Sequence, residues 1–299
     1  MQTKQSQFVA DLAVDAMSGP EAVGFMLASH IKALNAARDA VPRIAQAAEL
    51  LAETLRSGST VHYAAAGSSG LMAMADACEL PGTFRVPESQ IRICMAGGIP
   101  VDARMPGDAE DGQGEAVTAA AAVKSGDIAV VVSASGTTPY ALAFANAASA
   151  RGAKIVGLAN VAGSALLELA DVPIAVATAP EVVGGSTRLG AGTAQKVVMN
   201  MISTQAGVLL GHVHEGMMVN LNPDNIKLRR RASDIVSRIA DVAASDAERA
   251  LEETGYDVKL ASLVASGLDV ATAQKLLEQN DGHLRPCLQQ IAEGQHTNN

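Results

Sequence analysis

The chain has 299 residues, a formal net charge of -9 at pH 7 and only 2% aromatic residues. An acidic chain lacks the concentrated basic face that binding to nucleic acid or to an anionic membrane requires. So few aromatic rings cannot form the stacking platforms of a protein that binds single strands. Because 48% of the residues are hydrophobic and 18% are charged, the composition predicts a folded globular chain rather than a disordered one.

The three cysteines are Cys78, Cys94 and Cys287. An odd number without a CxxC spacing indicates neither a disulfide framework nor a thiolate zinc site. The first residues lack the apolar stretch of a secretory signal. The longest apolar runs, such as Ile128–Val132, are far shorter than the roughly 20 residues of a membrane-spanning helix. We therefore expect a cytoplasmic protein.

Two helices are expected in an N-terminal helical segment over residues 1–58. Ser18–Glu21 has the pattern of a capping box with an early proline. Apolar residues follow at helical spacing from Val23 to Leu34 and again from Val41 to Leu55.

Five short apolar runs then alternate with stretches that are long enough for helices. The runs are Val61–Ala65, Ile91–Met95, Ile128–Val132, Lys154–Leu158 and Val172–Val176. This alternation predicts βαβ units and a parallel sheet. Strands that are apolar almost throughout predict helices on both faces of the sheet. The sequence thus indicates a doubly wound α/β domain over residues 59–222.

The remaining residues, 223–299, are expected to form a small C-terminal helical module. Ser245–Glu248 has the pattern of a second capping box. Short amphipathic helices are predicted near residues 257–266 and 270–279.

Two segments rich in Gly, Ser and Thr follow the first and third expected strands. They are Ala66–Gly70 and Ser133–Thr138, and each leads into a helix. Ligands of open parallel sheets bind beyond such strand ends, and helix N-termini favour anions such as phosphate. The same residue types are also ordinary caps and turns, so each segment alone leaves both roles open. Neither segment is a Walker A or GxGxxG motif, which argues against a nucleotide cofactor.

Glu79 and Glu110 are candidates for a carboxyl pair that divides acid and base roles. Their spacing alone favours the alternative, two solvated surface carboxylates. His212 and His214 have no third ligand at a suitable spacing, so we expect no metal site there.

The segment Glu181–Lys196 resembles the signature of N-acetylmuramic acid 6-phosphate etherases, which have the SIS (sugar isomerase) fold. Further matches, in the same order along the chain, are Ala96–Gly98, Ala109–Asp111, Ser133–Tyr140 and Asn225–Leu228. The resemblance extends over nearly the whole chain.

This resemblance implies a SIS-type doubly wound parallel sheet flanked by helices, with N-terminal helices and a small C-terminal helical module. It implies a homodimer with its active site near the subunit interface. It also implies a carbon–oxygen lyase that cleaves the C3 lactyl ether of N-acetylmuramic acid 6-phosphate, or of a related amino-sugar acid, in cell-wall recycling. Elimination and water addition would give an N-acetylglucosamine-type sugar and D-lactate, without metal or cofactor.

The matching segments assign the acid role to Glu79 and the base role to Glu110. The resemblance places contacts with a sugar or sugar phosphate at a further set of positions, namely Gly67, Ser68, Ser69, Ser133, Ser135, Gly136, Thr137, Thr138, Glu181, Ser186 and Lys196.

Leu71 and Gly190 depart from the family pattern, which has Arg and Lys at these positions. Losing two charge-assisted donors would weaken the binding of a phosphate or carboxylate. Either the substrate is a different or unphosphorylated sugar acid, or a neighbouring cation such as Arg188 or Lys196 compensates. Two other functions stay open, a SIS-fold sugar-phosphate isomerase and a non-catalytic sugar-phosphate-binding regulator.

Overall fold

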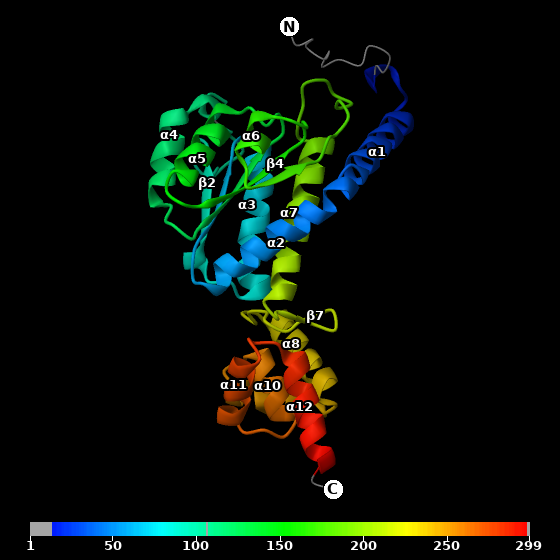
Figure 1. Ribbon diagram of the computed structural model, residues 1–299. Coiled ribbons are helices and arrows are strands. Elements are labelled where there is room, and N and C mark those ends of the chain that lie inside the picture. The colour runs from blue at the N-terminus through cyan, green and yellow to red at the C-terminus, as the bar shows by residue number, and fades with distance from the viewer. Residues whose placement is uncertain (1–13, 106, 298–299) are drawn as a thin grey trace. The chain divides into compact units, whose positions relative to one another are not determined.

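A computed structural model describes residues 14–105 and 107–297 of the chain (Figure 1). These residues form two compact units. The first comprises the described residues up to Ala77 together with Glu88–Ser203, and the second comprises Cys78–Pro87 and the residues from Thr204 onward. The expected division at residues 58 and 222 stays a prediction.

The first unit begins with the helices α1 (Gly19–Asn35) and α2 (Val41–Arg56). The expected capping box is confirmed, because the Glu21 carboxylate accepts a hydrogen bond of 3.0 Å from the Ser18 backbone N–H. The apolar stripe of α2, which includes Ile44 and Leu51, is buried. These two helices therefore start and stop where the sequence predicts.

The five expected strands form one parallel sheet. They are β1 (Val61–Ala65), β2 (Ile91–Met95), β3 (Ile128–Ser133), β4 (Lys154–Ala159) and β5 (Val172–Ala175). Their order is β2-β1-β3-β4-β5, with every neighbouring pair parallel. In this order the chain reverses its direction of travel between β1 and β3, which is where open α/β sheets place their ligands.

Helices cover both faces of the sheet, as the apolar strands require. Helix α3 (Gly67–Phe84) lies on one face (Figure 1). The other face carries α4 (Gln113–Ala119), α5 (Pro139–Ser149) and α6 (Ala165–Leu169), as Figure 1 shows. Helix α7 (Gly190–Leu209), whose residues up to Ser203 belong to the first unit, lies with α2 and α3 (Figure 1). The expected doubly wound fold is confirmed.

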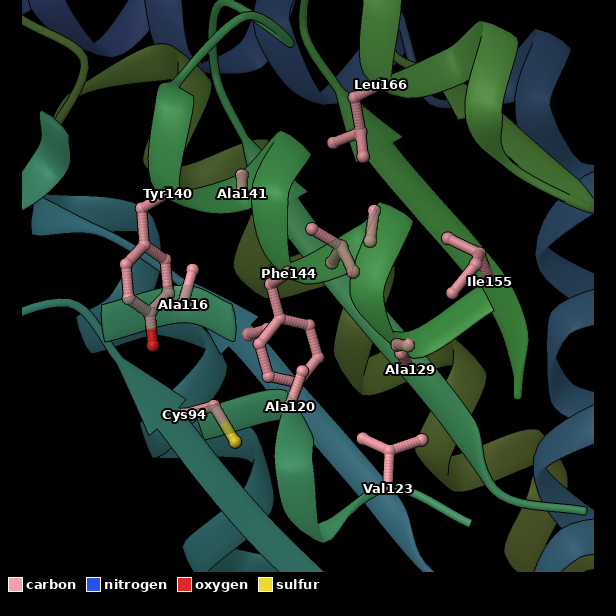
Figure 2. Close-up of a cluster of buried hydrophobic side chains, with 14 of the residues drawn as sticks. Cys94, Ala116, Ala120, Val123, Ala129, Tyr140, Ala141, Phe144, Ile155 and Leu166 are labelled. Carbon is pink, nitrogen blue, oxygen red and sulfur yellow. The ribbon is translucent and has the colours of Figure 1, made fainter. Parts of the chain in front are cut away.

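A buried cluster fills the space between the sheet and α4–α6 (Figure 2). Tyr140 and Phe144 of α5 supply its largest side chains, and both are almost fully buried. The small side chains of Ala116 and Ala120 on the neighbouring helical segments leave room for these rings (Figure 2). Truncating Phe144 to Ala would cost about 3–5 kcal/mol.

The second unit has its own hydrophobic core. A short hairpin, β6 (Val213–His214) and β7 (Met217–Met218), precedes its helices. The helices are α8 (Ile226–Ala240), α9 (Ala244–Glu253), α10 (Val258–Ala265), α11 (Val270–Gln279) and α12 (Leu284–Thr297). The helices expected near residues 257–266 and 270–279 are confirmed as α10 and α11.

The expected capping box at Ser245–Glu248 is wrong. Helix α9 begins at Ala244, and its N-cap is Ala243, which provides no side-chain bond. The Asp246 and Ala247 backbone N–H groups bond to the Ala243 carbonyl instead. Ser245 therefore lies inside the first turn, where its hydroxyl cannot cap the helix.

No helix in the described part of the chain combines the length and the apolar character needed to cross a bilayer.

Candidate functional site

The segment after β3 is a cluster of hydroxyl groups held together by its own hydrogen bonds. Ser133 Oγ accepts from the Gly136 N–H at 3.0 Å and lies 2.8 Å from Thr138 Oγ1. Ser135 Oγ accepts from the Thr137 hydroxyl at 3.0 Å. These bonds fix the turn that leads into the N-terminus of α5, and this helix end offers N–H groups to an anion.

Gly136 allows this turn to pack closely on the segment that precedes α6. Its φ of +67° lies in the left-handed region that favours glycine. A Cβ at this position would collide with the side chain of Ser164. The Gly136 carbonyl also accepts a hydrogen bond of 2.9 Å from the Leu166 N–H, which joins the turn to α6.

The segment after β1 is the start of a helix rather than a loop. Helix α3 begins at Gly67, directly after β1, so Ser68 and Ser69 belong to its first turn. Ser69 is buried, and Ser68 is partly exposed. Because Ala65 of β1 pairs with Val132 of β3, this helix start and the hydroxyl turn follow adjacent strands. The two hydroxyl-rich segments thus flank the reversal point of the sheet.

Glu110 lies against the first residue of α3. It belongs to a short 3-10 helix, η4 (Ala109–Asp111), that follows β2. A Cβ at Gly67 would collide with Glu110 Oε1, so a side chain at this position would displace the carboxylate. The structure therefore brings the candidate base together with Gly67 at the carboxyl edge of β1.

A cavity of about 340 Å³ opens at the same edge of the sheet, beyond β3, β4 and β5. Ser135, Glu181 and Ser186 line it, as do Asn160 and Thr178. Gln195 Nε2 of α7 donates a hydrogen bond of 2.8 Å to Asn160 Oδ1 and so orients the Asn160 side chain. The cavity is of a suitable size for a small polar ligand such as a sugar.

Glu181 caps the N-terminus of α7. Its Oε2 accepts from the Gly190 N–H at 2.9 Å, and its Oε1 accepts from the Ala191 N–H at 3.0 Å. A Cβ at Gly190 would lie 3.1 Å from the Ala33 Cβ, which is tighter than most such contacts. The glycine at the position where the family pattern has Lys therefore belongs to a closely packed helix start.

The remaining candidates occupy different parts of the two long helices. Lys196 lies in α7 and is partly buried. Glu79 lies in α3 and is exposed, in the part of this helix that belongs to the second unit. The other candidate residues belong to the first unit.

His212 and His214 belong to the second unit. No group of three potential His, Cys, Asp or Glu ligands occurs among the residues that the structure describes. Burial lowers the pKa of His212 to about 4, and its Nδ1 atom has no hydrogen-bond partner. The pKa of His214 is also lowered by burial. Both side chains are therefore neutral near pH 7, and the expectation that they bind no metal stays a prediction.

Sequence reasoning misses three polar residues of the cavity wall, which are Asn160, Thr178 and Thr187. Asn160 follows the last residue of β4, so a search of every strand end would have found it. Thr178 lies in an irregular segment between β5 and α7 where no local pattern marks it. Thr187 lies inside the signature segment Glu181–Lys196, so that pattern could have marked it.

The SIS domain family matches residues 28–160 of the chain. An N-acetylmuramic acid 6-phosphate etherase of Streptomyces avermitilis is 41% identical over 251 residues, which cover 83% of this chain and 81% of that protein. Another, of Serratia proteamaculans, is 38% identical over 282 residues and covers 93% of this chain and 95% of that protein.

Solved structures show the same fold. A phosphoheptose isomerase from Francisella tularensis superposes with a TM-score of 0.51 at 20% identity, over 64% of this chain and 98% of that chain. A Bacteroides fragilis protein described as a putative phosphosugar isomerase gives a TM-score of 0.53 at 19% identity, over 67% of this chain and 95% of that chain. With relatives at about 40% identity over most of its length, this chain belongs to the N-acetylmuramic acid 6-phosphate etherase family.

Proposed function

We propose that this protein cleaves the lactyl ether at C3 of N-acetylmuramic acid 6-phosphate, giving N-acetylglucosamine 6-phosphate and D-lactate. The observation that carries the proposal is the identity of 41% to an enzyme of that name over 83% of the chain. We place this activity in the cytoplasm, in the recycling of cell-wall amino sugars.

Glu110 serves as the base of the reaction. In the open-chain sugar the C1 aldehyde acidifies the C2–H bond, so a carboxylate can remove this proton. The position of the Glu110 carboxylate against Gly67, at the N-terminal end of α3, supports this role. The electron pair released from C2–H then forms the C2–C3 double bond.

Glu79 serves as the acid. It gives a proton to the ether oxygen as the C3–O bond breaks, so lactate leaves with a hydroxyl group and the sugar becomes an unsaturated aldehyde. Water then adds its oxygen to C3, and C2 regains a proton. The sum is one water consumed and one ether bond cleaved, with no oxidation or reduction.

The phosphate is bound by the turn Ser133–Thr138, here called the hydroxyl turn, and by the first turn of α3. Their hydroxyl groups and helix N-termini supply neutral donors and favourable dipoles for an anion. Ser133 and Ser135 are already held in place by bonds within the turn. Lys196 or Arg188 supplies the positive charge that is missing at Leu71 and Gly190.

A homodimer is part of this proposal, and the exposed face of α1 supports it. Val23, Leu27 and Ile31 recur every four residues on this helix and are 65%, 61% and 52% exposed. An exposed apolar stripe of this kind marks a protein interface. We expect light scattering to give about twice the monomer mass of 30.5 kDa. The variant Leu27→Lys/Ile31→Lys should be monomeric, whereas Ile226→Lys, at an exposed apolar residue of the second unit, should stay dimeric.

The activity is tested by measuring D-lactate release and C2–H exchange in deuterated water with N-acetylmuramic acid, with and without the 6-phosphate. The wild type should release lactate from the phosphorylated sugar. Glu79→Ala should exchange C2–H without releasing lactate, and Glu110→Ala should do neither. Glu88→Gln, at an exposed carboxylate, is the matched control and should behave as wild type.

Other outcomes separate the alternatives. Lactate release from the unphosphorylated sugar alone would assign an etherase of a different substrate. An isomerase would exchange C2–H of sugar phosphates and would not need Glu79, because its reaction has no leaving group to protonate. A regulator would bind sugar phosphates without turnover.

A further inference from the structure

The cavity beyond β3, β4 and β5 contains an amide whose orientation is fixed, the side chain of Asn160. Asn160 lines the cavity and is only 5% exposed. Its Nδ2 donates to the Val176 carbonyl at 3.2 Å, and its Oδ1 accepts from Gln195 Nε2 at 2.8 Å. Each bond uses one N–H or one lone pair, so the amide retains one donor and one acceptor for a ligand.

The cavity adjoins the hydroxyl turn. The Asn160 backbone N–H donates to the Ala134 carbonyl at 3.0 Å, and Ala134 and Ser135 of the turn both line the cavity. All of these residues belong to the first unit. A sugar whose phosphate is bound by the hydroxyl turn therefore has another part within reach of the cavity.

The wall of the cavity carries a negative charge and no positive charge. Glu181 lines the cavity, and none of the described residues that line it is a lysine or an arginine. The Gly190 and Ala191 N–H groups at the start of α7, where an anion would otherwise be favoured, already donate to Glu181. Because like charges repel, a phosphate or a carboxylate is disfavoured here. The cavity thus fits an uncharged part of the substrate.

Apolar residues complete this wall. Ala134, Val161 and Ala179 lie among its polar side chains. Sites of this kind bind groups that combine a small apolar part with a few hydrogen-bonding atoms. An acetamido group has an N–H, a carbonyl and a methyl, whereas the lactyl group of the same sugar ends in a carboxylate and its hydroxyl groups have no methyl.

We propose that the cavity binds the acetamido group at C2 of the amino sugar and that Asn160 selects for this group. This inference rests on the proposed function. The Asn160 amide donates to the acetamido carbonyl and accepts from the acetamido N–H, while the methyl lies against Val161. Gln195 is a positioning residue, because its bond holds the Asn160 amide in the orientation that offers both groups.

The test compares N-acetylmuramic acid 6-phosphate with 3-O-lactylglucose 6-phosphate, in which a hydroxyl replaces the acetamido group. Selectivity is the ratio of kcat/KM for lactate release from the first sugar to that from the second. Asn160→Ala should lower this ratio about tenfold, which is the effect of losing about one hydrogen bond. Gln195→Leu should lower it by a smaller factor. A general loss of structure would lower both values of kcat/KM equally and leave the ratio unchanged.

Val161→Phe serves if Asn160→Ala does not fold. Val161 is 51% exposed, so the variant should fold, and the larger ring would fill the space for the methyl and lower the ratio. Asn146→Ala is the matched control. Asn146 also donates to a backbone carbonyl, that of Leu142 at 3.0 Å, but it is exposed on α5 and does not line the cavity. Its ratio should equal that of the wild type.

An unchanged ratio in folded Asn160→Ala, or in Val161→Phe, would overturn the inference and leave the proposed function standing. A wild type that releases lactate equally well from both sugars would do the same. A wild type that releases lactate from neither sugar would overturn the proposed function, and the inference with it.

Discussion

The carboxylate of Glu110 occupies the space that any side chain at Gly67 would fill. Gly67 is the first residue of α3 and has a φ of +54°, so its conformation favours glycine, and any side chain here would displace the Glu110 carboxylate. This contact places the candidate base at the end of β1, one of the two strands between which the chain reverses direction. It also makes the position of Glu110 sensitive to a single methyl group.

Replacing Gly67 with Ala should displace Glu110 and lower both C2–H exchange and lactate release by about a hundredfold. The measurement is the two rates with N-acetylmuramic acid 6-phosphate. Gly58→Ala is the matched control, because Gly58 also has a positive φ, of +78°, but has no atom within 4 Å of a built Cβ. Wild-type exchange in Gly67→Ala would show that the Glu110 position does not depend on this contact.

Replacing Ser133 with Ala should raise the KM for the phosphorylated sugar. The Ser133 hydroxyl accepts from the Gly136 N–H and contacts Thr138, so its loss releases the turn. One lost hydrogen bond to a polar ligand or its support costs about 1–3 kcal/mol, which corresponds to about a fivefold to 150-fold change. Steady-state kinetics measure the effect, with the exposed Ser149→Ala as control. An unchanged KM would remove the turn from the phosphate site.

Replacing Glu181 with Gln should destabilise the protein by about 1 kcal/mol. The Glu181 carboxylate accepts two backbone N–H groups at the start of α7, and a negative charge there is favoured by the helix dipole. Urea unfolding measures the loss. Glu49→Gln, at an exposed carboxylate in the middle of α2, should leave stability unchanged. Equal stability of wild type and Glu181→Gln would contradict the capping role.

Acid should destabilise the protein through His212. Burial lowers the pKa of His212 in the folded chain from 6.5 to about 4, so below pH 6.5 the unfolded chain binds the proton and the folded chain does not. Its contribution to stability is complete above pH 6.5 and is lost as the pH falls toward 4. Between pH 7 and pH 5 the loss is about 2 kcal/mol.

Urea unfolding of wild type and His212→Phe at pH 7 and pH 5 measures this loss. The variant should lose about 2 kcal/mol less than wild type between the two values. His62 and His214 also have lowered pKa values and remain in both proteins, so the comparison isolates His212. The same pH dependence in both proteins would show that His212 is not responsible.

The sheet could be predicted from the sequence because its central strands β1, β3 and β4 are buried on both faces. The bounds of β1 and β2 agree with the expected apolar runs. In contrast, β3 and β4 each extend one residue further, because Ser133 and Ala159 still pair after the apolar run ends. The ends of β3 and β4 are set by backbone pairing, which cannot be predicted from the hydrophobicity of the residues.

Contacts between residues far apart in the chain could not be predicted. Asp76 is bound by residues 124 and 127 positions away, and no local pattern marks their pairing. The capping of α7 by Glu181 spans a nine-residue gap and does not follow the local capping pattern. At Ser245 the residues match the capping-box pattern, but the helix does not use it, because α9 starts one residue earlier. The roles of the site residues stay predictions.

The most direct test of the account is the reaction of the wild type with N-acetylmuramic acid 6-phosphate in deuterated water, followed by mass spectrometry of both products. Elimination and water addition predict one D-lactate for each sugar, and one deuterium bound to C2 of the N-acetylglucosamine 6-phosphate. Lactate release with no deuterium at C2 would contradict the account, because the ether would then break without removal of the C2 proton.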